Sequence, residues 1–396
     1  MTLHAPSCDV DFYGDATLRD PARAYRRMLD RGPVVWLTAQ NMLAICGHDA
    51  LTRALRDHRR FQSGQGVSIN AEVNRVLIGS TLHSDPPAHD ATRAITFAPL
   101  SPKALTDIRA RVTDEATRLA DTVCAQQEFD AARDLAPHLP LRIVRDLVGL
   151  GEAGKENMLS WGAATFELMG DPRTRGDDAR QRLAALRAFL DDPSVLAGLH
   201  PDGWARRATQ RGIADGMDPG RAVELMRDYI APSLDTTISA IGYAIHLFSN
   251  APAQWARLRA DRTLIANAVE EVVRLNTPIR AFSRYVAEDV ELAEVSIPKG
   301  ARVLVVFGAA NRDPQKFADP DRFDITRETR GHVGFGHGKH TCLGMHLARL
   351  EITALLEALA DRVERFEALA PPEPALNATI HAFARVPVRA HLAGRA

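Results

Sequence analysis

The chain has 396 residues, of which 45 % are hydrophobic, 25 % charged and 6 % aromatic, a composition typical of a globular protein with one large domain or a few smaller ones. The 49 basic and 50 acidic residues give a net charge of −1, which argues against nucleic-acid or membrane-surface binding through bulk charge. The sequence shows no secretory signal and no apolar run approaching the roughly 18 residues that span a bilayer, and its four cysteines are scattered. We therefore expect a cytoplasmic protein that binds neither nucleic acid nor membrane.

Most of the chain has the apolar periodicity of amphipathic helices. An Asp-Pro start signal opens the first of them, Asp20–Asp30. The same 3.6-residue spacing predicts further helices over Ala104–Ala125, Arg180–Asp191, Pro219–Ser249 and Asn267–Asn276. With no repeat and no Pro/Gly/Ser linker in the chain, this pattern favours a single, mainly α domain.

Strand signals occur in two places. Val34–Leu37 and Met42–Cys46, separated by TAQN, predict a hairpin. Val290–Leu292 and Arg302–Phe307, with the turn-like IPKG between them, predict a second small sheet. The segment Phe61–His83 lacks periodicity and is either a binding loop or an ordinary surface loop. The predicted fold class is therefore mainly α with small β-sheets.

The stretch from Phe335 to Gly344, FGHGKHTCLG, carries the strongest chemical signal. Its glycines allow tight turns, and a helical pattern follows directly at Met345–Leu359. Cys342 is thus predicted just before a helix N-terminus, where backbone N–H groups and the helix dipole lower the pKa of a thiol and favour a soft metal ligand. A lone cysteine is more often inert core, and a zinc site would have only His340 and Cys342 as local ligands.

FGHGKHTCLG resembles the haem-binding loop of the cytochromes P450, Phe-Gly-x-Gly-x-His-x-Cys-x-Gly, and further matches extend from about residue 20 to the C-terminus. The resemblance implies a triangular, helix-rich prism in which Cys342 ligates the iron of haem b and favours O–O cleavage. It also implies one domain over residues 1–396. This domain would have a β-containing portion at about 30–80, a helical core at about 85–275 and a haem-binding portion at about 276–396.

Two further motifs match the family's structural framework. Glu271 and Arg274 resemble the Glu-x-x-Arg pair, whose spacing places acid and base on one helical face. Downstream, PQKFADPDRFD resembles the meander, and Arg322 is the arginine that the resemblance pairs with Glu271. A carboxylate between two guanidiniums would have a structural role. Taken alone, the Glu-x-x-Arg pair also fits a solvated helix.

Four basic residues are implied as partners of the haem propionates. His89 and Arg93 lie four residues apart in DPPAHDATR, so both reach the same edge of a helix. Arg284 precedes the second predicted sheet, and His340 lies in the cysteine loop. Each of the four would by default be a surface residue.

Asp235 and Thr236, within APSLDTT, match the acid–alcohol pair of the family's oxygen-activating helix. Such a pair relays protons to dioxygen, directly or through water, and argues against the peroxide-using subgroup. The competing interpretation is a capping signal in a broken helix. The family's Ala/Gly-Gly is replaced here by Pro232-Ser233, so a kink is expected.

The resemblance places the substrate in an apolar, partly aromatic pocket suited to a small hydrophobic ligand. Its expected lining is Thr165, Phe166, Leu168, Met169, Ala231, Ile279 and Phe282, with Gln65, Ser68 and Arg280 as polar anchors. Side chains at helical spacing are more often plain core. The chain resembles bacterial P450s that hydroxylate or O-demethylate small aromatic acids and methoxyarenes, and terpenes, fatty acids and macrolides stay open.

The expected activity is a haem-thiolate monooxygenase that inserts one atom of O2 into a C–H bond. Electrons would come from NAD(P)H through a ferredoxin reductase and an acidic ferredoxin. The ferredoxin would dock near Cys342 on Lys339, His337 and Arg349, unless these are simple solvated surface. The alternatives are a non-catalytic haem or gas sensor with the same loop, and a haem-free structural protein.

Overall fold

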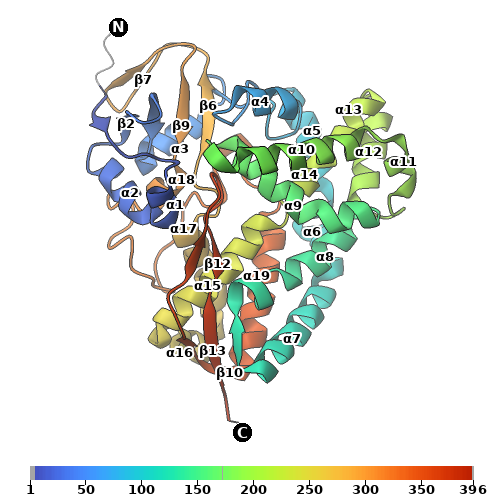
Figure 1. The fold of residues 1–396 in the computed structure, drawn as a ribbon, viewed down its shortest axis with the longest axis vertical. Helices are drawn as coiled ribbons and strands as arrows, with labels where there is room; N and C mark the ends of the chain where they lie inside the picture. The colour runs from blue at the N-terminus through green and yellow to red at the C-terminus, as the bar shows by residue number, and fades with distance from the viewer. Residues whose placement is uncertain (1–4, 172, 395–396) are drawn as a thin grey trace.

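The computed structural model describes residues 5–171 and 173–394 (Figure 1). The helices are α1 (Asp15–Arg19), α2 (Pro21–Leu29), α3 (His48–Arg56), α4 (Ala71–Leu77), α5 (Ala88–Phe97), α6 (Pro102–Leu105), α7 (Arg109–Gln126), α8 (His138–Val148), α9 (Glu152–Met169), α10 (Gly176–Asp191), α11 (Pro193–Gly198), α12 (Trp204–Ala214), α13 (Pro219–Glu224), α14 (Arg227–Ile230), α15 (Asp235–Asn250), α16 (Pro252–Ala260), α17 (Ile265–Asn276), α18 (Phe307–Ala310) and α19 (Met345–Arg362). The mainly α fold class is thereby confirmed.

The strands form one six-stranded sheet and three small ones. The strands are β1 (Ser7–Cys8), β2 (Val34–Leu37), β3 (Met42–Ile45), β4 (Phe61–Gln62), β5 (Glu128–Asp130), β6 (Phe282–Val286), β7 (Val290–Leu292), β8 (Val295–Ile297), β9 (Arg302–Val305), β10 (Val363–Ala368), β11 (Glu373–Ala375), β12 (Ala382–Arg385) and β13 (Pro387–Leu392). Figure 1 shows β2, β6, β7 and β9 gathered beside the N-terminal helices, with α8 to α14 on the opposite side.

The early hairpin is confirmed, because β2 and β3 pair antiparallel with Val34 opposite Ile45. The second predicted sheet is wrong in its partners. β7 pairs with β8, whereas β9 lies between β3 and β6 inside the six-stranded sheet, parallel to β3. Burial explains this difference, since Val303, Leu304 and Val305 are completely buried and fit a central strand.

The segment Phe61–His83 is more regular than predicted, because it contains β4 and α4. Asn70 caps α4 through hydrogen bonds from two backbone N–H groups, those of Glu72 and Val73. A second difference concerns the long predicted helix at 219–249, which consists of α13, α14 and α15 with an irregular stretch at 231–234. Pro232, which has no N–H and clashes with the preceding turn, stands in that stretch, so the expected kink is a full break.

The helical core lies around α15, which packs against α17 and α19, while α19 runs along α7 (Figure 1). Phe248 and Trp255 are completely buried there, with ring centroids 4.9 Å apart. This packing holds α15, α17 and α19 together in the helical core. Within the described residues, no helix has both the length and the apolarity needed to cross a membrane.

Candidate active site

The cysteine loop is held in place by its own backbone. The Cys342 N–H donates to the Phe335 carbonyl at 2.8 Å, which closes the loop. Gly336 and Gly338 have φ values of +74° and +70°, the left-handed region that favours glycine. A Cβ on Gly338 would lie 2.5 Å from the Leu55 carbonyl oxygen, so α3 also requires glycine at this position. The loop therefore presents Cys342 in one fixed orientation.

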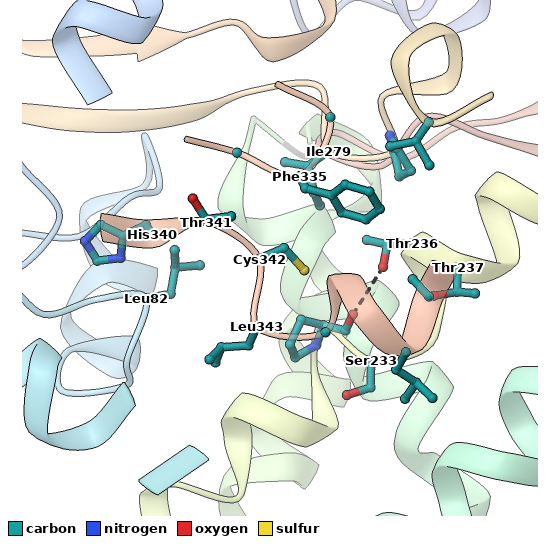
Figure 2. A pocket seen from close by; sticks show the side chains of 18 of the residues that line it. Leu82, Ser233, Thr236, Thr237, Ile279, Phe335, His340, Thr341, Cys342 and Leu343 are labelled. Carbon is teal, nitrogen blue, oxygen red and sulfur yellow. Dashed lines mark hydrogen bonds between the residues drawn. The ribbon is translucent and has the colours of Figure 1, made fainter. Parts of the chain in front are cut away.

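Cys342 faces an internal pocket. The other three cysteines are buried, whereas Cys342 is accessible and lines the pocket together with Thr236 on α15 and Phe335 in the loop. Figure 2 shows its sulfur turned toward the side of the pocket where Thr236 lies. The accessible surface of this thiol therefore belongs to a cavity wall between α15 and the cysteine loop.

The pKa of the Cys342 thiol is raised, contrary to the predicted lowering. Burial is the largest influence, and it outweighs the stabilisation of a thiolate by the backbone N–H groups of Gly344 and Met345 and by Arg93 and Arg349. A coordinated metal ion deprotonates a thiol outright. The helix N-terminus alone does not make Cys342 a thiolate, and the sequence prediction overlooked the cost of burying the charge.

The four predicted propionate partners meet at one end of the pocket. Arg93, Arg284 and His340 line it, and His89 packs against His340 with ring centroids 4.5 Å apart. Arg93 also donates to the Thr341 carbonyl at 2.7 Å, which ties α5 to the cysteine loop. These four residues come from three separate segments of the chain, namely α5, β6 and the cysteine loop.

This basic end of the pocket fits a buried anion. The Nε2 atoms of His89 and His340 are both buried without a hydrogen-bond partner. Burial, followed by the charges of Arg284, His89 and Arg93, lowers the pKa of His340 to about 2. Buried polar atoms without partners are costly, and two carboxylates would supply acceptors for both imidazoles and both guanidiniums. The residues present therefore fit a haem, which Cys342 would ligate and whose propionates these four basic residues would bind.

Asp235 and Thr236 begin α15, at the break caused by Pro232. Thr236 Oγ1 donates to the Pro232 carbonyl at 3.3 Å, as Figure 2 shows. Asp235 Oδ2 is buried without a hydrogen-bond partner, and burial raises the pKa of Asp235 to about 7. A Cβ on Gly162 of α9 would lie 2.6 Å from Asp235 Oδ2, so glycine makes room for the carboxyl group.

The buried ion pair of α17 is present, but its third member differs from the prediction. Arg274 donates to both oxygens of Glu271, at 2.7 and 2.8 Å, and both side chains are completely buried. Arg327 Nε donates to Glu271 at 3.0 Å. Arg322 instead pairs with Asp324 at 3.0 Å and is exposed. The predicted contact of Arg322 with Glu271 is wrong, because the meander turns between 319 and 324 and places the later arginine over the carboxylate.

The predicted substrate residues are only partly at the pocket. Phe166, Ile279 and Phe282 line it. Thr165 donates to the Trp161 carbonyl, and Met169 packs behind the pocket wall in the apolar cluster that also contains Phe166. Neither of these two is among the lining residues, nor is Ala231, whose carbonyl lies over Gly162.

The three predicted polar anchors also lie away from the pocket lining. Arg280 donates to the Phe12 and Ala378 carbonyls and stacks over the Phe12 ring at 4.4 Å. Ser68 donates to the Met169 carbonyl at 2.8 Å, and Gln65 uses its backbone carbonyl to hold Arg302. These three residues thus hold neighbouring segments of the fold together instead of facing the pocket.

Two acidic residues of the pocket wall were missed. Asp228 on α14 and Glu351 on α19 both line the pocket. Burial raises the pKa of Asp228 to about 6 and that of Glu351 to about 8. The sequence held a signal for both residues. Asp228, Pro232 and Thr236 are spaced four residues apart, which places them on one side of a helix, and Glu351 lies in the predicted helix that follows Cys342.

The predicted docking cations are largely paired within the chain. Lys339 bonds Asp90 at 2.9 Å. Arg349 bonds Glu270 at 2.6 Å and stacks over Phe335 at 4.6 Å. The surface near Cys342 thus carries less unpaired positive charge than the sequence indicated.

Comparison with known proteins identifies the family. The sequence model described as Cytochrome P450 matches residues 217–391. The chain is 34 % identical over 388 residues to cytochrome P450 CYP199A2 of Rhodopseudomonas palustris, covering 97 % of this chain and 94 % of that protein. The chain belongs to the cytochrome P450 family.

Other P450 relatives agree along the whole chain. Linalool 8-monooxygenase of Pseudomonas putida is 33 % identical over 376 residues, covering 89 % of this chain and 91 % of that protein. The solved structure of cytochrome P450 CYP109Q5 from Chondromyces apiculatus aligns with a TM-score of 0.78 at 25 % identity, covering 98 % of this chain and all of that one. The protein is therefore a bacterial-type P450 monooxygenase that uses haem b, O2 and a redox partner. This membership disfavours the two alternatives, a gas sensor and a haem-free structural protein.

Proposed function

We propose that this P450 inserts one atom of O2 into a C–H bond of a small hydrophobic, aromatic substrate, by hydroxylation or O-demethylation. The observation that carries the proposal is the pocket between Cys342 and Thr236, whose wall includes Phe166, Ile279 and Phe282. Apolar and aromatic walls with a few polar groups are suited to such ligands. In this proposal, residues 1–396 act as one P450 domain.

Cys342 is the proposed ligand of the haem iron, and His89, Arg93, Arg284 and His340 are the proposed partners of its propionates. The bound haem supplies the O2 chemistry. The Arg93 bond to the Thr341 carbonyl ties α5 to the cysteine loop, so the residues that would bind the propionates and the residue that would ligate the iron belong to linked segments. The unpartnered Nε2 atoms of His89 and His340 support this assignment.

Asp235 and Thr236 are the proposed proton-relay residues. Asp235 has a pKa near 7, so its carboxyl group both holds and releases a proton at neutral pH. Thr236 stands next to it on the wall opposite Cys342 and retains acceptor capacity on its hydroxyl oxygen. The break at Pro232 supplies the local opening of the helix in which a water molecule could join the two side chains.

A ferredoxin, reduced through a ferredoxin reductase and NAD(P)H, is the proposed electron donor. Support comes from the basic surface around the cysteine loop, where Arg56 is exposed and donates from Nε to His337 at 2.9 Å. Lys339 adds to this surface, although Asp90 offsets its charge. An acidic partner would be attracted to this face mainly through an increased association rate.

The test combines spectroscopy with turnover. Small arenes are screened for a low-to-high spin shift of the haem, and ligands that bind are incubated with ferredoxin, reductase, NAD(P)H and O2. Oxygen-dependent product from the wild-type enzyme would support the proposed reaction. A larger amount of NAD(P)H consumed per product in Thr236→Ala would support the proposed relay. Absence of product from every bound arene would refute the substrate class, and unchanged product per NAD(P)H in Thr236→Ala would refute the relay.

A further inference from the structure

Asp228 places a carboxylate in the wall of the substrate pocket. It lies on α14, four residues before Pro232 and eight before Thr236, and all three line the pocket. Ser233, Thr236 and Thr237 from the following segment line the same pocket. The Asp228 residue is half-buried, yet its surroundings in the protein raise the pKa of its carboxyl group. Because Asp228 lines the pocket, we assign its accessible surface to the cavity.

This carboxylate has unused hydrogen-bonding capacity. The Thr81 N–H donates to Oδ2 at 3.2 Å. The adjacent Arg227 is engaged elsewhere, because it pairs with Glu224 at 2.5 Å and donates to the Val76 carbonyl at 2.6 Å. An ionised carboxylate accepts about four hydrogen bonds, so Asp228 retains acceptor sites toward the cavity.

The substrate side of the pocket offers no opposing positive charge among the described residues. The arginines of the lining are Arg93 and Arg284, and both lie with His340 at the end assigned to the haem propionates. Arg280, one of the predicted polar anchors, is tied to two backbone carbonyls elsewhere. A carboxylate on the substrate would therefore meet the Asp228 carboxylate without a cation between them.

We propose that Asp228 is a specificity-determining residue that accepts a hydrogen bond from a hydroxyl or amino group of the substrate and excludes aromatic carboxylates. This inference rests on the proposed oxidation of small aromatic compounds and narrows their class. Of the two substrate types that the sequence resemblance suggested, aromatic acids and methoxyarenes, it excludes the acids. This selectivity depends on one position of the pocket wall. The Asp228 carboxylate repels a substrate anion and accepts a hydrogen bond from a substrate hydroxyl or amino group.

A purely structural role is the alternative, in which Asp228 only anchors the backbone at Thr81. Asp228→Asn separates the two roles, because the amide oxygen still accepts from the Thr81 N–H while the negative charge is lost. Asp215→Asn is the matched control, since Asp215 is an exposed residue at the end of α12 outside the pocket lining.

The experiment measures dissociation constants of the haem-loaded enzyme by spin-state titration with 4-methoxybenzyl alcohol, 4-methoxytoluene and 4-methoxybenzoate. Because a hydrogen bond to a charged acceptor is worth about 10- to 100-fold in affinity, we expect the alcohol to bind about 10-fold or more tightly than the toluene. The benzoate should bind weakest. Asp228→Asn should reduce the alcohol-to-toluene ratio to about threefold or less and improve benzoate binding, whereas Asp215→Asn should leave both ratios unchanged.

Several outcomes would overturn the inference. These are tightest binding of the benzoate, unchanged ratios in Asp228→Asn, and failure of all three probes to bind. Unfolding curves of each variant show whether altered binding comes from a damaged fold. Turnover is scored separately, so preferred binding of the alcohol without any oxygen-dependent product would refute the proposed function while leaving the role of Asp228 in binding supported.

Discussion

Arg327 donates from Nε to the completely buried carboxylate of Glu271 at 3.0 Å. The same guanidinium donates from Nη2 to the carbonyls of Asp319 and Arg322, at 2.9 and 3.0 Å. One side chain therefore joins α17 to the irregular meander that precedes the cysteine loop. Removing one partner of a buried ion pair leaves an uncompensated charge and typically costs about 3–5 kcal/mol.

We expect Arg327→Ala to lower the free energy of unfolding by about 3 kcal/mol or more, because Glu271 loses one of its two guanidinium partners. Arg322→Ala is the matched control, since Arg322 is exposed and its side chain pairs, among the described residues, with Asp324 alone. It should cost less than about 1 kcal/mol. Denaturant unfolding of the haem-loaded variants measures both. Equal losses would contradict the assignment of Arg327 as the buried partner.

The contrast between Arg322 and Arg327 shows which parts of the site can be predicted from the sequence and which cannot. The cysteine loop was predictable because its glycines, His340 and Cys342 all lie within residues 335–344, and the positive φ of Gly336 and Gly338 ties those two positions to glycine. Arg322 and Arg327 both lie in an irregular segment, where the path of the chain decides which side chain reaches Glu271. No periodicity encodes such a path.

The substrate wall was harder to predict for a related reason. Phe166 lines the pocket and Thr165 does not, although they are neighbours, because about 100° of helix rotation separates them. Asp228 belongs to the pocket only through the orientation of α14 before the break at Pro232. Sequence spacing gives the face of a helix, whereas tertiary packing gives the direction in which that face points.

Asp235 should make productive turnover depend on pH. Burial raises its pKa to about 7, so the carboxyl group is protonated below that pH and ionised above it. If the protonated form supplies the relay, product formed per NAD(P)H should fall as the pH rises through about 7. Asp235→Asn should give a low and flat profile, because its amide does not titrate. A wild-type profile that is flat between pH 6 and 8 would exclude Asp235 as the controlling acid.

Gly162 provides a second test of the surroundings of Asp235. A Cβ at this position of α9 would lie 2.6 Å from Asp235 Oδ2 and 2.8 Å from the Ala231 carbonyl oxygen. Glycine to alanine within a helix normally stabilises by roughly 0.5–1 kcal/mol. We expect Gly162→Ala to destabilise the protein and to lower product per NAD(P)H, because the carboxyl group must move.

Gly198→Ala is the control for that variant, since Gly198 ends α11 and an added Cβ would meet no atom from another part of the described structure within 4 Å. It should leave product per NAD(P)H unchanged. Thermal unfolding and turnover, measured on both variants, separate a general helix effect from the effect on Asp235. Normal stability and turnover in Gly162→Ala would show that the close contact is not required.

Glu351 should make stability depend on pH. Neither of its carboxylate oxygens has a hydrogen-bond partner, and burial raises its pKa to about 8 from an ordinary value near 4.5. The unfolded chain therefore releases this proton near pH 4.5, whereas the folded chain keeps it until about pH 8. Because the folded state holds more protons in between, the free energy of unfolding falls as the pH rises through this window, by at most about 1.4 kcal/mol per pH unit for this group.

Glu351→Gln removes that titration, so the variant should lose less stability than the wild type between pH 5 and 8. Glu357→Gln is the matched control, because Glu357 is an exposed residue of the same helix, α19. Denaturant unfolding of the haem-loaded proteins at several pH values gives the comparison. The free energy of unfolding could instead differ between wild type and Glu351→Gln by the same amount at every pH. That result would show that Glu351 ionises as an ordinary carboxylate whose oxygens are hydrated.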